Sequence, residues 1–326
     1  MNTSRTIDTL LDRSVALGYG SLGLQARRRL PGWPADAPRM DGKVVLVTGA
    51  GSGIGQAACV GFARLGARVR PLGRNDRRAR EAADRVVDAV PGADVRPVAC
   101  DVSSLAQLRG FGEAFMQSES RLDVLVNNAG VMPDTRTRSA DGHELMFATH
   151  VLAPFALIAL LRGILAASAP SRVINVSSGG MYGQQIPGDD LESDTTMYSP
   201  KKFYARTKRE EVAISEMWSQ RLAGRGVAVH AMHPGWVDTE GVRRWMPVFR
   251  TVTQPIIRSA EEGADTVVWL GAAPEAVTGS GGFWHDRRRR PTHYAVGPAE
   301  DSPEDRERLW EKCRSLVEAA GISVGE

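Results

Sequence analysis

The sequence predicts a doubly wound α/β domain, with a mostly parallel sheet of about seven strands and helices on both faces. From Lys43 onward, short apolar runs alternate with longer stretches of helical periodicity. Parallel strands need crossover connections of this kind, and because they are covered on both faces their runs are continuously apolar. A glycine-rich turn also follows the first apolar run directly, which is typical of a strand that leads sharply into a helix.

Each predicted strand is a short apolar run, and each predicted helix keeps its apolar residues on one face. The strands are predicted at residues 44–47, 69–72, 95–99, 124–126, 173–176, 227–232 and 283–284. The helices are predicted at residues 54–65, on a charged stretch that ends near 90, from 104 onward, at 155–165 and from 200 onward. Pro71 lies within the second strand and cannot donate a ladder hydrogen bond, so we expect the strand to end early there or to carry a bulge.

The domain is predicted at residues 41–285, with a segment on each side. Residues 1–40 are predicted to be a partly helical appendage, because apolar residues between 7 and 15 recur at helical spacing before a proline-rich stretch. We expect this helix to pack on the main body. A membrane-surface contact, helped by the arginines at 27–29, is the alternative.

Residues 286–326 are predicted to be a basic loop followed by a closing helix. The helix is expected over residues 302–320, which are rich in charges and carry spaced apolar side chains. The run of four arginines at 287–290 is interpreted as a solvated face, because charge runs are usually exposed to water.

The composition is that of an ordinary globular protein. Among the 326 residues, 41 Lys and Arg stand against 38 Asp and Glu, a formal net charge of +3, with 42% hydrophobic residues. This balance gives no case for nucleic-acid binding. The longest apolar run, Val151–Leu161, has 11 residues, short of the ~20 that cross a bilayer, so no transmembrane segment is predicted. Three scattered cysteines and no secretory signal indicate a cytoplasmic protein without a disulfide or metal site.

The glycine-rich turn, residues 48–55, predicts a dinucleotide site. Its glycines allow a sharp turn and a close approach to a pyrophosphate, which then lies on the helix N-terminus. The second predicted strand ends in Gly73-Arg74-Asn75, with no acid before Asp76. An arginine suits the 2′-phosphate of NADP, so NADP is preferred over the alternative, NAD. The cofactor residues predicted here are Thr48, Gly49, Ser52, Gly53, Ile54, Gly55 and Arg74.

Two Tyr-x-x-x-Lys pairs follow the fifth predicted strand. Ser199-Pro200 reads as the start of a helix, with serine at the N-cap and proline at the first position. Tyr198 then lies outside this helix, whereas Tyr204 and Lys208 lie inside it on one face. A free tyrosine has a pKa near ~10 and is a poor base, and an ammonium one turn further along favours the phenolate. The second pair is therefore the candidate catalytic pair.

Polar motifs also follow the neighbouring strands. They are Asn127–Gly130 after the fourth strand, Ser177-Ser178 after the fifth and His233–Thr239 after the sixth. Doubly wound sheets bind their ligands at the carboxyl ends of the strands, so we expect these motifs to converge with Tyr204 on one site.

Together, over about residues 41 to 285, these motifs resemble the Rossmann-type short-chain dehydrogenase/reductase family, and within it the retinol-dehydrogenase-like branch. The resemblance implies that Ser178 holds the substrate oxygen, that Tyr204 exchanges a proton with it, and that Lys208 favours the phenolate and binds the nicotinamide ribose. It also implies cofactor contacts from Asp101 to the adenine, from Asn128, and from Thr239 to the carboxamide. The remaining cofactor residues that it implies are Val102, Ala129, Gly130, Pro234, Gly235 and Val237.

One position departs from the family pattern. Family members usually carry Asn in an F-x-x-N string, where it supports a water chain to the lysine, and this chain has Phe147-Ala148-Thr149-His150. His150 can serve that relay, weaken it, or be a satisfied core residue. A catalytically weak NADP-binding redox sensor or scaffold is therefore the alternative to an enzyme.

The predicted partner is a small-molecule carbonyl or alcohol. An apolar cluster after the sixth strand is typical of a substrate lid and favours a lipophilic substrate, although ordinary loop packing is the alternative. The cluster consists of Trp236, Trp245, Met246, Val248 and Phe249. A homo-oligomer, and a cytoplasmic protein with a weak membrane-peripheral contact, stay open at this point.

Overall fold

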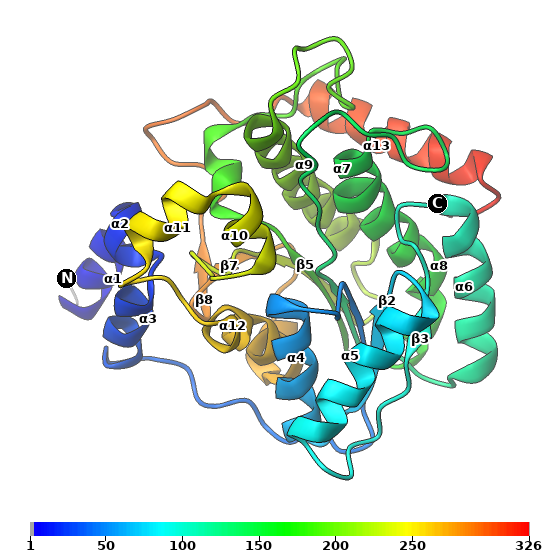
Figure 1. Cartoon of the computed structure of the whole chain (residues 1–326), viewed down its shortest axis with the longest axis horizontal. Coiled ribbons are helices and arrows are strands. Elements are labelled where there is room, and N and C mark those ends of the chain that lie inside the picture. The colour runs from blue at the N-terminus through cyan, green and yellow to red at the C-terminus, as the bar shows by residue number, and fades with distance from the viewer. Residues whose placement is uncertain (1–2, 326) are drawn as a thin grey trace.

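The computed structural model describes residues 3–325 and contains one eight-stranded sheet (Figure 1). The strand order is β3-β2-β1-β4-β5-β6-β7-β8, parallel throughout except for the β7–β8 pair. The strands are β1 Val44–Thr48, β2 Arg68–Gly73, β3 Val98–Ala99, β4 Val124–Asn127, β5 Ser171–Val176, β6 Val227–Met232, β7 Phe283–His285 and β8 Arg288–Arg290. The predicted α/β class is confirmed, with one strand more than the seven predicted.

Helices cover both faces of this sheet. One face carries α4 Gly53–Arg64, α5 Asp76–Ala89 and α12 Ala260–Ala272, and the other carries α6 Leu105–Ser118, α8 Ala153–Ala167 and α9 Pro200–Arg221. In β1 the side chains alternate between the two faces: Val45 and Val47 pack under α4, and Val44 and Leu46 face the opposite layer. Every residue of β1 is buried, as a central parallel strand requires. The closing helix, α13 Pro303–Ala319, packs on α9.

The expectation for Pro71 is wrong. β2 runs straight through it, and Pro71 pairs with Val47 of β1. The Val69 amide bonds Asp94 on the β3 side, so by the alternation of the ladder the Pro71 nitrogen also faces that side. β2 and β3 pair there only through an isolated bridge and two residue pairs, so no ladder hydrogen bond is lost. The third predicted strand, residues 95–99, is correspondingly shorter.

One long apolar helical stretch lies in the core. Residues Leu145–Ala167 comprise α7 Leu145–Phe147, a π-helical turn at Ala148–Leu152, and α8. Within residues 3–325, this is the stretch that is long and apolar enough to cross a membrane by length and composition, and 67% of its most apolar window is buried inside the fold. It packs against α6 and α9 as a core helix of the domain.

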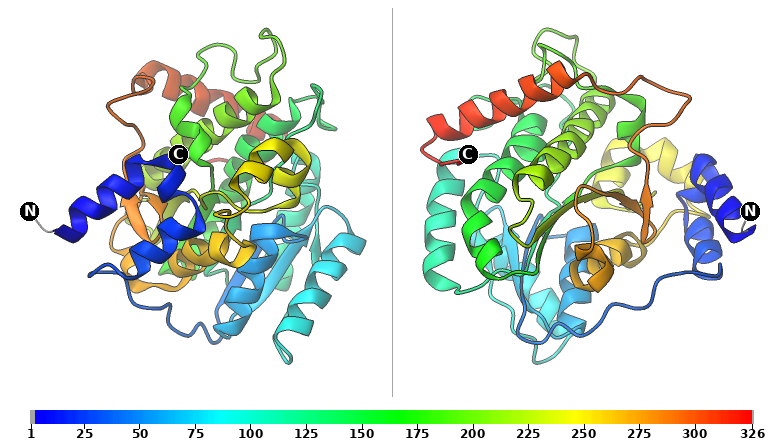
Figure 2. Two further views of the ribbon diagram at one scale, coloured as in Figure 1. Left: turned by 60° about the vertical axis from the view of Figure 1, so that its left-hand side comes forward. Right: turned by 180° about the vertical axis from the view of Figure 1, so that it is seen from behind.

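The N-terminal segment forms three helices that lie beside the β7–β8 hairpin (Figure 2). They are α1 Thr3–Arg13, α2 Val15–Gly18 and α3 Ser21–Arg28. The expected packing on the main body is confirmed. Arg27, which the membrane alternative needs at the surface, is fully buried and bonds Asp8 at 3.0 Å, so that part of the alternative is wrong.

The solvated face predicted for residues 287–290 is also wrong in large part. Arg288–Arg290 forms β8, and Arg290 is buried and pairs with Asp8 on α1 at 2.8 Å. Arg287 is 9% exposed and pairs with Asp265 on α12 at 2.7 Å. Two of the four arginines therefore fasten the hairpin to its neighbours.

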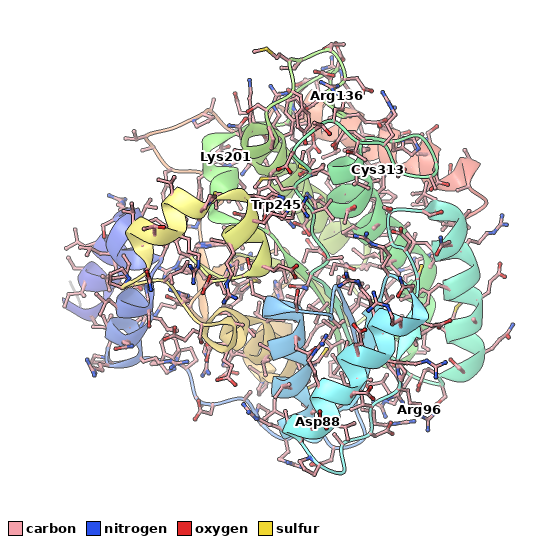
Figure 3. All side chains as sticks on the ribbon, viewed as in Figure 1. Asp88, Arg96, Arg136, Lys201, Trp245 and Cys313 are labelled. Carbon is pink, nitrogen blue, oxygen red and sulfur yellow. The ribbon has the colours of Figure 1, made fainter. Side chains whose placement is uncertain are left out.

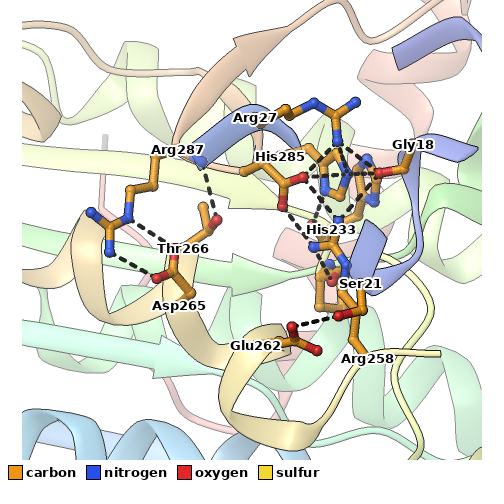
Figure 4. Close-up of polar contacts among 12 residues, drawn as sticks. Gly18, Ser21, Arg27, His233, Arg258, Glu262, Asp265, Thr266, His285 and Arg287 are labelled. Carbon is orange, nitrogen blue, oxygen red and sulfur yellow. Dashed lines mark hydrogen bonds and ion pairs between the residues drawn. The ribbon is translucent and has the colours of Figure 1, made fainter. Parts of the chain in front are cut away.

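A buried ion network joins the N-terminal helices to Arg258 and Asp286 (Figure 4). Arg258 donates two hydrogen bonds to Asp286, at 2.6 and 2.9 Å, and Arg27 donates a third at 2.6 Å. All three side chains are at most 1% exposed. Arg27 and Arg258 also donate to the Gly18 carbonyl. The network thus fixes the N-terminal helices against the sheet.

We expect Asp286→Asn to lower the free energy of unfolding by about 3–5 kcal/mol, because buried Arg258 loses its charge partner and buried Arg27 keeps only Asp8. Urea unfolding at pH 7 measures this loss. The matched control is Asp41→Asn, which breaks an exposed pair with Arg39 and should cost less than about 1 kcal/mol. Equal losses in the two variants would contradict the role given to the network.

Candidate active site

Tyr204 and Lys208 lie in α9, and Tyr198 lies outside it. The helix begins at Pro200 with Ser199 as its N-cap residue, as the Ser-Pro pair predicts, although the Ser199 side chain makes no capping bond. The Tyr198 hydroxyl donates to the Pro133 carbonyl, and burial raises its pKa to about 12. Tyr198 is thus engaged in packing.

Tyr204 and Ser178 line the same cavity, whose volume is about 960 Å³. Ser178 follows β5 and starts the short helix Gly179–Gly183, where its Oγ accepts a bond of 3.2 Å from the Gly180 amide. The Ser178 hydroxyl hydrogen is not used in this bond. Both side chains are partly exposed, so each can meet a ligand.

Lys208 is buried near the Tyr204 ring. Its Nζ lies 5.9 Å from the centroid of the Tyr204 ring and donates to the Val176 carbonyl at 2.8 Å and to Glu211 Oε2 at 2.9 Å. Lys208 is 2% exposed, and Glu211 is 1% exposed. Sequence reasoning missed Glu211. The available signal was its position three residues after Lys208, which places both side chains on the same buried face of α9.

His150 is a satisfied core residue. It is fully buried in the π-helical turn, where its Nε2 accepts from the Val131 amide at 2.9 Å and its Nδ1 lies 2.8 Å from Thr207 Oγ1. An imidazole with one accepting and one donating nitrogen is neutral. Burial holds the His150 pKa well below its usual range, and the Lys208 ammonium lowers it further. Of the three alternatives for this residue, the geometry favours the third.

The glycine-rich turn is built around Thr48 and Asn128. Thr48 Oγ1 accepts from the amides of Asn128 and Ala129, at 2.9 and 3.0 Å. The Asn128 side chain donates to the carbonyls of Thr48 and Gly49, so it supports the turn directly. Gly49 has a φ of +64°, and a Cβ there would lie 2.7 Å from the Ala129 Cα. The turn therefore needs glycine at this position.

The turn leaves room for a dinucleotide. A Cβ on Gly51 would meet nothing within 4 Å, and the Ser52 side chain makes no capping bond to α4. The amides of the first turn of α4 are therefore free of a side-chain cap, which suits a pyrophosphate. Thr239, the N-cap residue of α10 Glu240–Trp245, lies next to the start of α4. Its methyl group would be 3.3 Å from a Cβ on Gly53. These residues fit the pyrophosphate of an NAD(P) cofactor.

Arg74 is exposed where β2 ends, and its side chain has no ion pair with any other residue between 3 and 325. Asp101 follows β3, and its Oδ1 accepts from the amide and the hydroxyl of Ser103. Val102 is buried, and Gly130 borders His150, from which a Cβ would lie at 3.5 Å. A contact that sequence reasoning missed is Arg85, which donates to the Gly51 carbonyl at 2.6 Å.

Predicted cofactor residues also reach the cavity that holds Tyr204. Those on its wall are Ile54, Tyr204, Pro234, Gly235, Val237 and Thr239. Four of the five predicted lid residues line it as well: Trp236, Trp245, Met246 and Phe249. Val248, on α11 Pro247–Thr253, is 76% exposed and does not belong to the lining, so the lid prediction is wrong for this residue.

The segments that flank the predicted domain complete the cavity. Arg13, Val15 and Tyr19 contribute from the N-terminal helices, and residues 294–298 contribute from the loop before α13. The Trp236 amide donates to the Tyr19 carbonyl at 2.8 Å, which ties this wall to the segment after β6. Sequence reasoning placed the whole site within residues 41–285 and missed these contributions.

Comparison with known proteins places these motifs in a family. The short chain dehydrogenase family model matches residues 43–247. Dehydrogenase/reductase SDR family member 12 of Bos taurus is 38% identical over 280 residues, which cover 86% of this chain and 87% of the relative. Retinol dehydrogenase 14 of Mus musculus is 36% identical over 294 residues, 83% of this chain and 87% of the relative.

Among solved structures, the RhlG/NADP complex of Pseudomonas aeruginosa superposes with a TM-score of 0.62 at 26% identity, over 75% of this chain and 94% of that one. The sheet order and the cavity at the carboxyl ends of the strands are consistent with the family of these relatives. The chain belongs to the short-chain dehydrogenase/reductase family of NAD(P)-dependent oxidoreductases.

Proposed function

We propose that this protein is an NADP-preferring enzyme that transfers a hydride between nicotinamide and a lipophilic carbonyl or alcohol, with Tyr204 as the general acid and base. The observation that carries the proposal is the shared cavity of Tyr204 and Ser178, with the Lys208 ammonium 5.9 Å from the Tyr204 ring. The name of the relative retinol dehydrogenase 14 supports chemistry at an alcohol or carbonyl carbon.

Tyr204 and Ser178 act on the substrate oxygen. NADPH, when bound, supplies a hydride to the carbonyl carbon. Tyr204 gives its hydroxyl proton to the carbonyl oxygen, so hydride and proton together convert the carbonyl to an alcohol; in oxidation Tyr204 takes the proton back. Ser178 donates its free hydroxyl hydrogen to the same oxygen and orients it. Holding these groups in place accounts for much of the expected acceleration.

Lys208 supports Tyr204 through its charge. An ammonium has three hydrogens, of which two are used by Val176 and Glu211. The third is left for the nicotinamide ribose. Glu211 holds the Lys208 Nζ in place and partly offsets its charge, so we assign Glu211 as a positioning residue.

Arg74 supports the preference for NADP. It is exposed after β2, where a dinucleotide-binding fold reads the adenosine ribose. No carboxylate precedes it at the end of this strand to take the 2′-hydroxyl of NAD. The NADP in the RhlG complex is consistent with this choice.

The cavity supports a lipophilic substrate. Its wall contains Trp236, Trp245, Met246 and Phe249 beside the reacting groups. At about 960 Å³ it lies near the upper end of the usual range for small-molecule sites, which leaves room for a substrate next to a nicotinamide.

Tyr204→Phe tests the proton transfer. We expect kcat for NADPH-dependent reduction to fall about 10²–10⁴-fold, because the proton donor is lost, while the Kd for NADPH stays within about threefold. Initial rates on a panel of aldehydes, ketones, retinoids and steroids measure the first quantity, and NADPH fluorescence measures the second. Tyr198→Phe is the matched control and should keep its activity. Turnover by Tyr204→Phe at the wild-type rate would refute the assignment.

Arg74→Ala tests the cofactor preference. Loss of a charge-assisted contact to the 2′-phosphate should raise the Kd for NADPH by about 10–100-fold and leave the Kd for NADH within about twofold. Fluorescence titration gives both constants. Arg77→Ala, which removes an exposed arginine already paired with Glu81, is the control. Equal losses for the two nucleotides would exclude a 2′-phosphate contact.

Glu211→Gln tests the state of the buried pair. Burial raises the pKa of the Glu211 carboxyl from 4.5 to about 7, against the opposing effect of Lys208. Between these values the folded protein holds a proton that the unfolded chain has lost, so the free energy of unfolding falls as the pH rises.

We expect that fall to be smaller in Glu211→Gln, by up to about 1.4 kcal/mol per pH unit. Urea unfolding at pH 5, 6, 7 and 8 measures it. Glu318→Gln, on the surface, is the control and should keep the wild-type slope. A Glu211→Gln slope equal to that of the wild type would show that this carboxyl does not titrate in the window.

A further inference from the structure

The charged groups on the cavity wall are of one sign. Arg13 and Lys201 line the cavity, and its lining within residues 3–325 contains no aspartate, glutamate or histidine. The remaining lining is apolar, aromatic, glycine or hydroxyl-bearing. An apolar cavity with two cations and no carboxylate favours a ligand that has an apolar body and a negative charge.

We propose that the substrate is amphipathic and carries an anionic head group, such as a carboxylate, that Arg13 and Lys201 bind while its carbonyl or alcohol carbon lies at Tyr204. The proposal deepens the proposed function, on which it rests. It distinguishes this substrate class from a neutral lipophilic alcohol or aldehyde of the same length.

Arg13 is a cation without an anion partner between residues 3 and 325. It is the last residue of α1, and its guanidinium is exposed and has no ion pair or hydrogen bond among the residues that the structure describes. Other arginines of these helices are paired: Arg27 with Asp8 and Asp286, and Arg28 with Asp265. The adjacent carboxylate, Asp12, is taken by Arg290 and Tyr294.

Lys201 lies on the same helix as the reacting tyrosine. It precedes Tyr204 by three residues, so both lie on one face of α9, about 4.5 Å apart along its axis. Figure 3 shows Lys201 beside the short helix Gly179–Gly183, with Trp245 on the facing α10. In the described part of the chain Lys201 has no ion pair.

The start of α9 adds a second reason to expect an anion. A helix N-terminus carries a partial positive charge, and acidic residues usually offset it. The first turn of α9 has no acidic residue, contains Lys201 and Lys202, and is not capped by the Ser199 side chain. Ammonium groups and helix dipole therefore repel one another at this end, and a bound anion relieves that repulsion.

The two cations come from different parts of the chain. Lys201 belongs to α9, whereas Arg13 is brought to the cavity by the N-terminal helices that the Asp286 network holds. Exposed charges attract an anion through water, so the effect on binding is moderate and weakens with salt. These properties define the test.

The first measurement compares ligands that differ only in the head group. With the NADPH-bound protein, we expect decanoate to bind about tenfold more tightly than decanol by calorimetry, and the difference to shrink between 50 and 500 mM NaCl. In kinetics, 10-oxodecanoate should have a kcat/KM about tenfold above that of its methyl ester. The difference should lie in KM, because the carboxylate does not take part in hydride transfer.

Variants assign the effect to residues. Arg13→Gln and Lys201→Gln should each raise the decanoate Kd and the KM for 10-oxodecanoate about three- to tenfold, and leave the values for decanol and the methyl ester unchanged. The matched controls are Arg29→Gln, at the exposed C-cap residue of α3, and Lys202→Gln, at the neighbouring lysine, neither of which lines the cavity. Both controls should behave as the wild type.

The outcomes separate the two proposals. Equal binding of decanoate and decanol, or equal losses in the cavity variants and their controls, would overturn the anionic head group even if the aldehydes are reduced. Preferential decanoate binding that depends on Arg13 and Lys201, without reduction of any aldehyde, supports the anion site and counts against the proposed function.

Discussion

The site depends on how α9 is attached to the end of β5. The Lys208 ammonium donates to the Val176 carbonyl at 2.8 Å, and the Ser177 hydroxyl donates to the Lys208 carbonyl at 2.7 Å. About two turns further along α9, the Asn175 side chain donates to Ser215 at 2.7 Å. These buried bonds fix the helix in register with the strand, and thereby bring Tyr204 to the cavity that Ser178 also lines.

The same attachment explains the unusual polarity of the α9 face that packs on the sheet. A buried ammonium is costly unless charges and hydrogen bonds compensate it, and Glu211 and the Val176 carbonyl provide that compensation. Glu211 has two opposing effects. It lowers the free-energy cost of burying the Lys208 ammonium, and it also reduces the positive electrostatic potential at Tyr204. His150 stays neutral nearby and adds no further charge.

The local part of this arrangement is predictable from sequence. The Ser199-Pro200 pair marks the start of α9 and separates Tyr204 from Tyr198, and the apolar runs mark every strand of the parallel sheet. What could not be predicted depends on pairs far apart in the chain. The arginines of β8 resemble a solvated run because a partner, Asp8, lies 282 residues away from Arg290. From the sequence, Pro71 is expected to interrupt its strand. The expectation is wrong because β3 does not pair with β2 at Pro71, and the sequence of β2 alone does not reveal this.

The cavity wall made by the N-terminal helices has a consequence for the order in which the protein is completed. Arg27 reaches its partner Asp286 across 259 residues of sequence, so these helices leave the ribosome long before the hairpin that receives them. The nucleotide-binding half of the sheet can form first, because domains acquire structure as they are synthesised. The substrate cavity is therefore completed last, because its wall combines Arg13, Val15 and Tyr19 with residues 294–298.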